Sequence, residues 1–260
     1  MNLSIIIPAY NEEKRIGKTL KAYLSHFENL RKMRKLDYSL IVVINNTTDR
    51  TEEIVKSFRK TSSRLSCLNL KKGGKGYATI EGFREALKMN PDLIGFVDAD
   101  MSTSPEEYSR LLGKLNGYDG IIASRYLPGA VVSPKPTLQR IIVSRVFNFL
   151  IRTLFFFPYA DTQCGAKIFR KEAIRKIANS LIITKWAFDV DLLYNLRKNK
   201  FKIREIPTVW SDKEYSKINF MRAGPFMALA IIRLRLLNSP FNSFVKLYDK
   251  MPKWIKIPIT

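Results

Sequence analysis

Short apolar runs alternate with longer amphipathic stretches through the first half of the chain. In the longer stretches apolar residues recur every three or four positions, which is the spacing of one face of a helix. Strand and helix in alternation are typical of a mainly parallel sheet with helices on both faces. The pattern therefore predicts an α/β fold. The expected strands are Leu3–Ile7, Leu40–Ile44, Leu65–Leu70, Leu93–Val97 and Gly120–Ala123.

Polar residues follow four of these strands, at the ends where parallel sheets bind their ligands. Asp98 and Asp100 come directly after the fourth strand, so both carboxylates project from the same face of the extended backbone. Two such carboxylates suit a hard cation, Mg²⁺ or Mn²⁺, whose remaining ligands are substrate phosphates. The alternative is a pair of acids that cap the next helix or pair with a nearby lysine.

A glycine-rich segment, Gly73-Gly74-Lys75-Gly76, follows the third strand. It lacks the earlier glycine and the following Ser or Thr of a P-loop, and it does not match GxGxxG. The sequence therefore gives no support to an NTPase or a dinucleotide-dependent enzyme. Lys75 at the start of a helix can still contact a diphosphate, together with backbone N–H groups. A plain turn is an equally good interpretation.

The chain is strongly basic, with 45 Lys and Arg against 23 Asp and Glu and a formal net charge of +22. A polyanion is therefore expected as a partner. Residues 133–160 include no acid, and a helix near 137–157 would separate apolar from polar side chains. Such a helix fits an anionic membrane surface, whereas the alternative is a core helix with a solvated basic face. The expected polar side consists of Arg140, Ser144, Arg145, Asn148 and Arg152.

The end of the chain is also basic and apolar, with four lysines among aromatic residues after Phe241. No run of about 18 apolar residues is free of charge, so no spanning helix is expected. We predict a catalytic domain over residues 1–210 and a membrane-associating extension over 211–260. The protein would be peripheral (monotopic) at the cytoplasmic face of a membrane. No nucleic acid is expected as a partner, because base-stacking and groove-reading motifs are missing.

Several segments match a known family. In them the chain resembles family 2 glycosyltransferases of the GT-A fold, and among these the polyprenyl (dolichyl) phosphate glucosyltransferases and mannosyltransferases. The resemblance implies a Rossmann-like sheet, a nucleotide-sugar donor and a polyprenyl phosphate acceptor. The matching segments are SIIIPAYNEE at 4–13, GGKGYA at 73–78, DADMSTSP at 98–105, DTQCGAKIFRKEA at 161–173 and WAFDVDLL at 186–193.

The resemblance also implies roles for individual residues. Asp98 and Asp100 hold the metal and the donor diphosphate. Asn45 stands where the family carries an aspartate that reads the base, and its amide offers a donor and an acceptor to uracil. Asp161 and Asp189 are candidates for binding sugar hydroxyls, with helix capping or an ion pair as the alternative. The other implied residues are Pro8, Ala9, Tyr10, Glu12, Lys75 and Ala99 for the donor nucleotide, Arg125, Arg140 and Ser144 for the acceptor phosphate, and Lys217 in a loop that closes on the donor, with Asp100, Arg125, Arg140 and Lys217 as the catalytic group.

The predicted reaction is an inverting, metal-dependent transfer of a hexose from a nucleotide diphosphate sugar to a polyprenyl phosphate. UDP-glucose is the favoured donor, because the DTQCG and WAFDVDLL segments resemble the glucosyl branch more closely. GDP-mannose is the alternative donor. A noncatalytic protein that binds lipid or nucleic acid is the alternative from another functional class.

Overall fold

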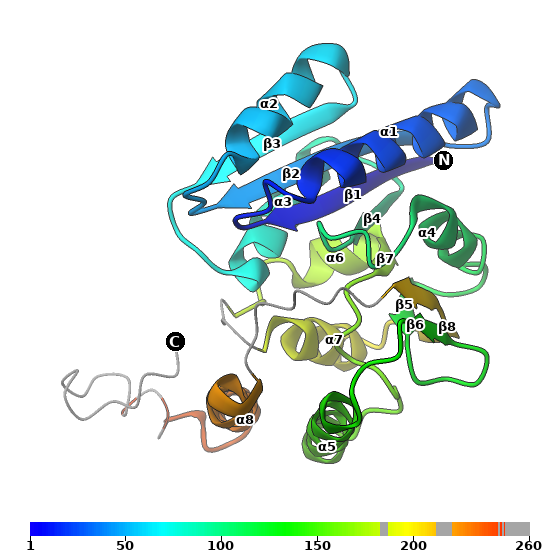
Figure 1. Cartoon of the computed structure of the whole chain (residues 1–260). Helices are drawn as coiled ribbons and strands as arrows, with labels where there is room; N and C mark the ends of the chain where they lie inside the picture. The colour runs from blue at the N-terminus through cyan, green and yellow to red at the C-terminus, as the bar shows by residue number, and fades with distance from the viewer. Residues whose placement is uncertain (183–186, 212–219, 244, 246, 248–260) are drawn as a thin grey trace.

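Strands form a larger and a smaller sheet in this computed structural model, which describes residues 1–182, 187–211, 220–243, 245 and 247. The larger sheet contains β1 (Asn2–Ala9), β2 (Asp37–Asn45), β3 (Leu65–Leu70), β4 (Leu93–Phe96), β5 (Gly120–Ser124), β7 (Lys167–Arg170) and β8 (Ile203–Pro207). Its spatial order is β3-β2-β1-β4-β7-β5-β8 (Figure 1). Neighbouring strands are parallel except at β7, which runs antiparallel to both β4 and β5. The smaller sheet pairs β6 (Val131–Ser133) with β9 (Val209–Ser211).

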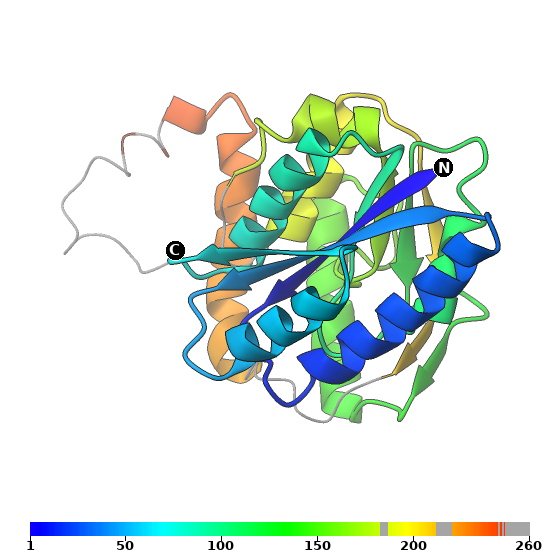
Figure 2. The same ribbon diagram turned by 90° about the horizontal axis from the view of Figure 1, so that it is seen from above.

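Helices cover both faces of the larger sheet (Figure 2). One face packs against α1 (Ile16–Lys32), α2 (Thr51–Thr61) and α4 (Pro105–Leu112). The core on the other face includes residues of α3 (Lys75–Lys88), α5 (Leu138–Phe155), α6 (Lys171–Ile177), α7 (Phe188–Lys198) and α8 (Phe220–Leu237). Strands β1 and β2 are buried from both sides, which explains why they are nearly continuous apolar runs in the sequence.

All five expected strands are present, as β1 to β5, and their parallel arrangement confirms the predicted α/β fold. Strands β7 and β8 are absent from the prediction. In β8 the charged residues Arg204 and Glu205 interrupt the apolar pattern, and β7 is a four-residue strand that begins with the buried Lys167. Neither segment has the composition on which a strand prediction depends.

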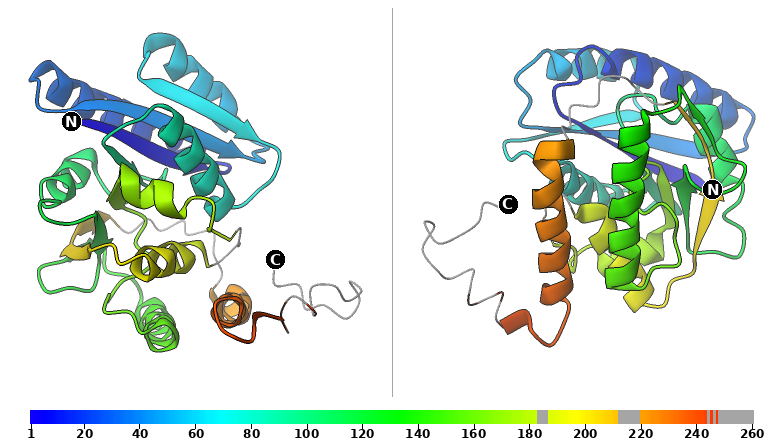
Figure 3. Two further views of the ribbon diagram at one scale, coloured as in Figure 1. Left: turned by 180° about the vertical axis from the view of Figure 1, so that it is seen from behind. Right: turned by 60° about the horizontal axis from the view of Figure 1, so that its bottom comes forward.

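Helices α5 and α8 contact each other and lie side by side at the bottom of the molecule in Figure 1, as the two views of Figure 3 also show. Both helices present apolar side chains to solvent. On α5, Ile142, Val146 and Phe149 are 53%, 63% and 69% exposed, and on α8 Phe226 and Ile232 are exposed to a smaller extent. Within the described residues, no helix combines the length and the apolar character needed to cross a membrane.

The residues expected on the polar side of α5 differ in their exposure to solvent. Arg145 and Arg152 are exposed, but Asn148 is buried. The side-chain carbonyl of Asn148 accepts hydrogen bonds from the backbone N–H and the hydroxyl of Thr162, at 3.2 and 3.1 Å. The expected amphipathic stripe is therefore wrong at Asn148, because Thr162 gives its amide hydrogen-bond partners inside the protein.

Gly82 lies in α3 where the helix packs on β1 and β2. A Cβ atom there would stand 2.5 Å from Ile6 Cγ2 and 3.2 Å from Val43 Cγ2. We expect Gly82→Ala to lower the free energy of unfolding by about 1–3 kcal/mol, because the core must shift to accommodate a methyl group.

Gly17→Ala in α1 is the matched control, because its Cβ would meet Ile54 Cγ2 at an ordinary 3.6 Å. That change should raise stability by about 0.5–1 kcal/mol through the lower flexibility of alanine. Urea denaturation measures both variants, and equal effects would contradict the packing argument.

Candidate active site

Asp49 ties together the loops that follow β1 and β2. Its carboxylate accepts hydrogen bonds from the backbone N–H groups of Glu13 and Thr51, and from the hydroxyls of Thr47 and Thr51. Burial alone would raise the pKa of Asp49, but these hydrogen bonds outweigh it and lower that pKa to about 2. The first turn of α2 is thereby held beside the segment that follows β1.

Asn45 ends β2 and is only 2% exposed. Its Nδ2 donates to the carbonyl of Ala9 at 3.0 Å, and its Oδ1 accepts from the backbone N–H of Gly74 at 3.0 Å. The amide thus joins the end of β1 to the glycine-rich turn before α3. The structure therefore gives Asn45 a positioning role, and its contact with a base stays a prediction. An aspartate could accept from Gly74 but could not donate to Ala9.

Two lysine–aspartate pairs form a cluster at the carboxyl edge of the sheet. Lys75 Nζ lies 2.5 Å from Asp98 Oδ1, and the buried Lys167 Nζ lies 2.5 Å from Asp189 Oδ1. Burial would raise the pKa of Asp98, but Lys75 and Lys167 hold it below its usual value. Burial would also lower the pKa of Lys75, yet Asp98 and Asp189 raise it. Positive and negative charges therefore balance within these four groups.

Asp98 and Asp100 are the residues predicted to hold a divalent cation. A Cβ on Gly165 would lie 1.9 Å from Asp98 Oδ2, so a glycine at 165 leaves the space that the carboxylate occupies. Asp100 Oδ1 accepts from the backbone N–H of Ser102 at 2.9 Å. Among the described residues, no three acidic, His or Cys side chains gather in a way that could hold a metal. Two carboxylates without a third protein ligand fit Mg²⁺ or Mn²⁺ that takes its other ligands from phosphates and water.

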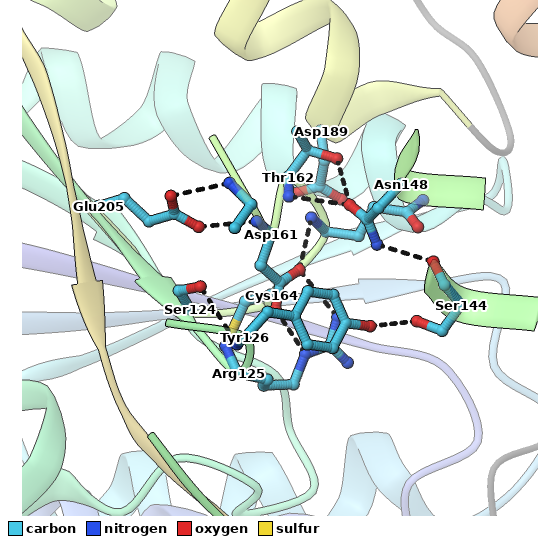
Figure 4. Close-up of polar contacts among 12 residues, drawn as sticks. Ser124, Arg125, Tyr126, Ser144, Asn148, Asp161, Thr162, Cys164, Asp189 and Glu205 are labelled. Atoms are coloured by element: carbon cyan, nitrogen blue, oxygen red, sulfur yellow. Dashed lines mark hydrogen bonds and ion pairs between the residues drawn. The ribbon is translucent and has the colours of Figure 1, made fainter. Parts of the chain in front are cut away.

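An ion pair between the partly exposed Arg125 and the buried Asp161 joins the end of β5 to the segment before β7 (Figure 4). The fully buried Asp161 accepts from Arg125 Nε, Nη2 and backbone N–H at 2.7, 2.9 and 3.0 Å, and from Gln163 N–H at 3.2 Å. Glu205 on β8 accepts from the backbone N–H groups of Ala160 and Asp161 at 2.8 and 2.7 Å. Burial would raise the pKa of Asp161, but Arg125 keeps it below its usual value. Each oxygen of Asp161 already accepts two hydrogen bonds, so the ion-pair interpretation replaces binding of a sugar hydroxyl.

The aspartates of α7 have different surroundings. Asp191 accepts from the backbone N–H of Ile182 at 2.6 Å and from Asn195 Nδ2 at 2.9 Å. Burial raises the pKa of Asp191 to about 7 despite these hydrogen bonds. Asp189 is bound only through Oδ1, to Lys167, and its side chain is 15% exposed. Within the described residues, Asp189 Oδ2 therefore has an acceptor position available for a ligand.

Tyr126 connects two residues that were predicted to bind the acceptor phosphate. Arg125 Cζ lies 5.4 Å from the centre of the Tyr126 ring and 5.3 Å from that of Trp210. The Tyr126 hydroxyl is hydrogen-bonded to the Ser144 hydroxyl on α5 (Figure 4). Arg140 lies one helical turn before Ser144. The structure thus brings Arg125 and Ser144 to the two ends of one tyrosine side chain.

Two residues of this site are absent from the predicted set. Tyr126 directly follows Arg125 at a strand end, which is the signal that could have indicated it. Lys167 is the lysine of a short, mainly apolar segment, and a charged residue there indicates a buried partner.

The remaining predicted donor residues lie near the ends of β1 and β4. Tyr10 is 48% exposed, and Glu12 forms an ion pair with Arg15 at 2.6 Å. Lys217 lies outside the described residues. The buried members of the set are Pro8, Ala9 and Ala99.

A sequence model of the family described as "Glycosyl transferase family 2" matches residues 4–178, well over half of the chain. The chain belongs to glycosyl transferase family 2. The matched region includes Asp98, Asp100 and Arg125. Membership of this family confirms the resemblance and the expectation of a sugar-transferring enzyme.

Relatives within the family cover nearly the whole chain. The dolichyl-phosphate beta-glucosyltransferase of Dictyostelium discoideum is 32% identical over 243 residues, which cover 90% of this chain and 73% of that protein. The human protein of the same name is 31% identical over 255 residues, which cover 92% of this chain and 77% of that protein.

Solved structures of family 2-like fold are similar in backbone but distant in sequence. Glucosyl-3-phosphoglycerate synthase from Mycobacterium tuberculosis, in complex with Mn²⁺, UDP and glucosyl-3-phosphoglycerate, matches with a TM-score of 0.60 and 17% identity over 90% of this chain and 78% of that one. The mannosyltransferase PcManGT from Pyrobaculum calidifontis, in complex with GDP-Man and Mn²⁺, matches with a TM-score of 0.58 and 15% identity. The match covers 96% of this chain and 65% of that one. At this identity the two structures confirm the GT-A-type fold alone.

Asp49 should make the stability of the protein depend on pH. Its pKa falls from 3.8 to about 2 on folding, so it stabilises the fold above about pH 4 and the stabilisation is lost as the pH falls towards 2. We expect Asp49→Asn to lower the melting temperature at pH 7, with a difference from wild type that narrows between pH 4 and 2. Thermal melts followed by circular dichroism between pH 7 and pH 2 measure this difference in melting temperature.

Glu53→Gln is the control, because it removes only an exposed ion pair between Arg50 and Glu53 in the first turn of α2. A difference between Asp49→Asn and wild type that stays constant from pH 7 to pH 2 would rule out this role for the carboxylate.

Proposed function

We propose that the chain transfers glucose from UDP-glucose to a dolichyl or related polyprenyl phosphate. The observation that carries the proposal is the ion pair of Asp98 with Lys75 at the carboxyl edge, which has Asp100 two residues further along the chain and Arg125 near enough to act on the pKa of Asp98. Its support is that this ion pair occurs in a family 2 glycosyltransferase whose relatives are named dolichyl-phosphate beta-glucosyltransferases.

On the donor side, Asp98 and Asp100 would hold Mg²⁺ or Mn²⁺, which would supply positive charge for the departing UDP. Lys75 at the first turn of α3 adds a cation beside the same diphosphate. The free acceptor position of Asp189 Oδ2 receives a sugar hydroxyl, while Lys167 fixes the other oxygen.

On the acceptor side, the phosphate is already an anion near neutral pH, so the reaction needs no strong general base. Arg125 directs its N–H groups that do not bind Asp161 to this phosphate, and Arg140 and Ser144 contribute from α5. Orientation of the phosphate for attack at the anomeric carbon supplies much of the rate enhancement. A single displacement inverts that carbon and gives a β-linked lipid phosphate sugar.

The acceptor reaches the site from a membrane on which α5 and α8 rest. Their exposed apolar side chains, among them Val146 and Phe149, would enter the boundary between headgroups and acyl chains. The net charge of +22 attracts anionic headgroups. We place this peripheral contact at the cytoplasmic face and include the segment 211–260 in it.

A donor screen tests the proposed reaction. Purified protein with polyprenyl phosphate in detergent and Mn²⁺ should form a lipid-linked sugar from UDP-glucose and not from GDP-mannose. Asp100→Ala should reduce the rate at least ~100-fold, because the charge on the leaving group loses its stabilisation. Asp92→Asn, at the opposite end of β4 and 61% exposed, is the control and should keep wild-type activity.

If the protein transfers sugar from GDP-mannose in preference to UDP-glucose, the transferred sugar is mannose and the glucose assignment is wrong. Absence of transfer from every nucleotide sugar, together with tight and salt-sensitive binding of nucleic acid, would favour the noncatalytic alternative.

Flotation on liposomes tests the membrane contact separately. We expect the double variant Val146→Ser/Phe149→Ser to float less with anionic liposomes, because it removes apolar area from the exposed face of α5. Its transfer to a short-chain acceptor in detergent should be unchanged. Met33→Ser/Met89→Ser removes two exposed apolar side chains elsewhere on the molecule and serves as the control. Equal flotation of the two double variants would count against α5 as the contact.

A further inference from the structure

Tyr126 holds a second guanidinium group besides that of Arg125. Arg145, which projects from α5, has its Cζ 4.2 Å from the centre of the Tyr126 ring, well within the range of a cation–π interaction. Arg125 Cζ is 5.4 Å from the same centre. One ring therefore brings together a cation from the end of β5 and a cation from α5.

The charges around this ring do not cancel. Arg125 is neutralised by Asp161, whose oxygens are fully used. The carboxylate of Glu205 is occupied by two backbone N–H groups. Within the described part of the chain, Arg145 contacts the Tyr126 ring and has no carboxylate partner. Among the described residues no carboxylate compensates the charge of Arg145, so an anion would be attracted to it.

The donors around the ring suit a phosphate. Arg125 uses Nε and one N–H of Nη2 on Asp161, so three of its five N–H groups, including both on Nη1, have no protein acceptor within the described residues. Trp210 and Tyr126 lie against the guanidinium group and limit its movement. A preorganised fork of this kind matches two oxygens of a phosphate group.

We propose that Arg145 is a further cationic residue of the acceptor-phosphate site, in addition to Arg125 and Arg140, and that Tyr126 positions it by holding its guanidinium group beside that of Arg125. The proposal rests on the proposed function, because it assumes a lipid-linked phosphate as acceptor. A phosphate monoester carries up to two negative charges near neutral pH, and the Arg125–Asp161 pair alone offers no net charge to balance them. Arg145 supplies this charge from α5, the helix whose exposed apolar residues would lie along the lipid chain.

Steady-state kinetics with farnesyl phosphate in detergent and the nucleotide sugar test the assignment. We expect Arg145→Gln to raise the KM for farnesyl phosphate about tenfold, the size of one charge-assisted contact, and to leave the KM for the nucleotide sugar within about twofold. Arg152→Gln removes an exposed arginine two turns further along α5 and should match wild type. Equal kinetics of Arg145→Gln and Arg152→Gln would overturn the proposal.

Variants of Tyr126 separate positioning from a general structural effect. Tyr126→Leu removes the ring and should raise the KM for farnesyl phosphate at least as much as Arg145→Gln does, because the ring also contacts Arg125. The double variant should be no worse than Tyr126→Leu alone, because the contact of Arg145 with the ring is already lost in that variant. Tyr126→Phe keeps the ring, loses the hydrogen bond to Ser144 and should recover most of the affinity for the acceptor. A fully additive double variant, or Tyr126→Phe as weak as Tyr126→Leu, would contradict the positioning role.

Flotation distinguishes the acceptor phosphate from other lipid headgroups. If Arg145 only attracts anionic bilayers, Arg145→Gln and Arg152→Gln will lower flotation on acceptor-free liposomes equally and leave the KM in detergent unchanged, which refutes the assignment. A wild-type protein that transfers no sugar to any polyprenyl phosphate refutes the proposed function itself. Transfer by wild type with no effect of Arg145→Gln refutes only the role of Arg145.

Discussion

Asp161 is a fully buried carboxylate, and its hydrogen bonds connect three separate parts of the chain. They join the end of β5, through Arg125, to the turn before β7, and Glu205 fixes that turn to β8. Removal of one partner from such a pair leaves a buried charge without compensation and costs about 3–5 kcal/mol. The orientation of Arg125 is therefore determined by the fold before any ligand binds. A cation fixed in advance needs little reorganisation when a phosphate arrives, which is the basis of electrostatic catalysis.

Sequence alone predicted the part of the fold that depends on local pattern. Strands β1 to β5 are apolar runs long enough to recognise, and the polar segments that follow them meet at one edge because parallel strands end there. That Asp98, Lys75 and Asn45 all lie at this edge follows from the same rule. The reversal of β7 could not be predicted, because a four-residue segment has no periodicity that reports its direction.

The roles of individual polar residues depend on partners that are distant in the sequence. The sequence alone does not distinguish Asp161, Asp189 and Asp191. In the structure the carboxylate of Asp161 accepts four hydrogen bonds, Asp189 has an oxygen available for a ligand, and burial raises the pKa of Asp191 to about 7. Asn148 is similar, because its burial depends on Thr162. Helical projection gives the angle of a side chain around its own axis, and the identity of the neighbour comes from tertiary packing.

The direction of β7 has a consequence for where this family 2 enzyme can vary. A strand that is antiparallel to its neighbours has its amino end beside their carboxyl ends. The turn with Asp161, Cys164 and Gly165, which precedes β7, therefore lies at the site. The other end of β7 leads into α6 at the opposite edge of the sheet. Changes before Lys167 would thus alter the site, whereas changes after Arg170 would affect the packing of α6, away from the site. We therefore expect the tolerance of the sequence to change to differ between the two ends of β7, which are only four residues apart.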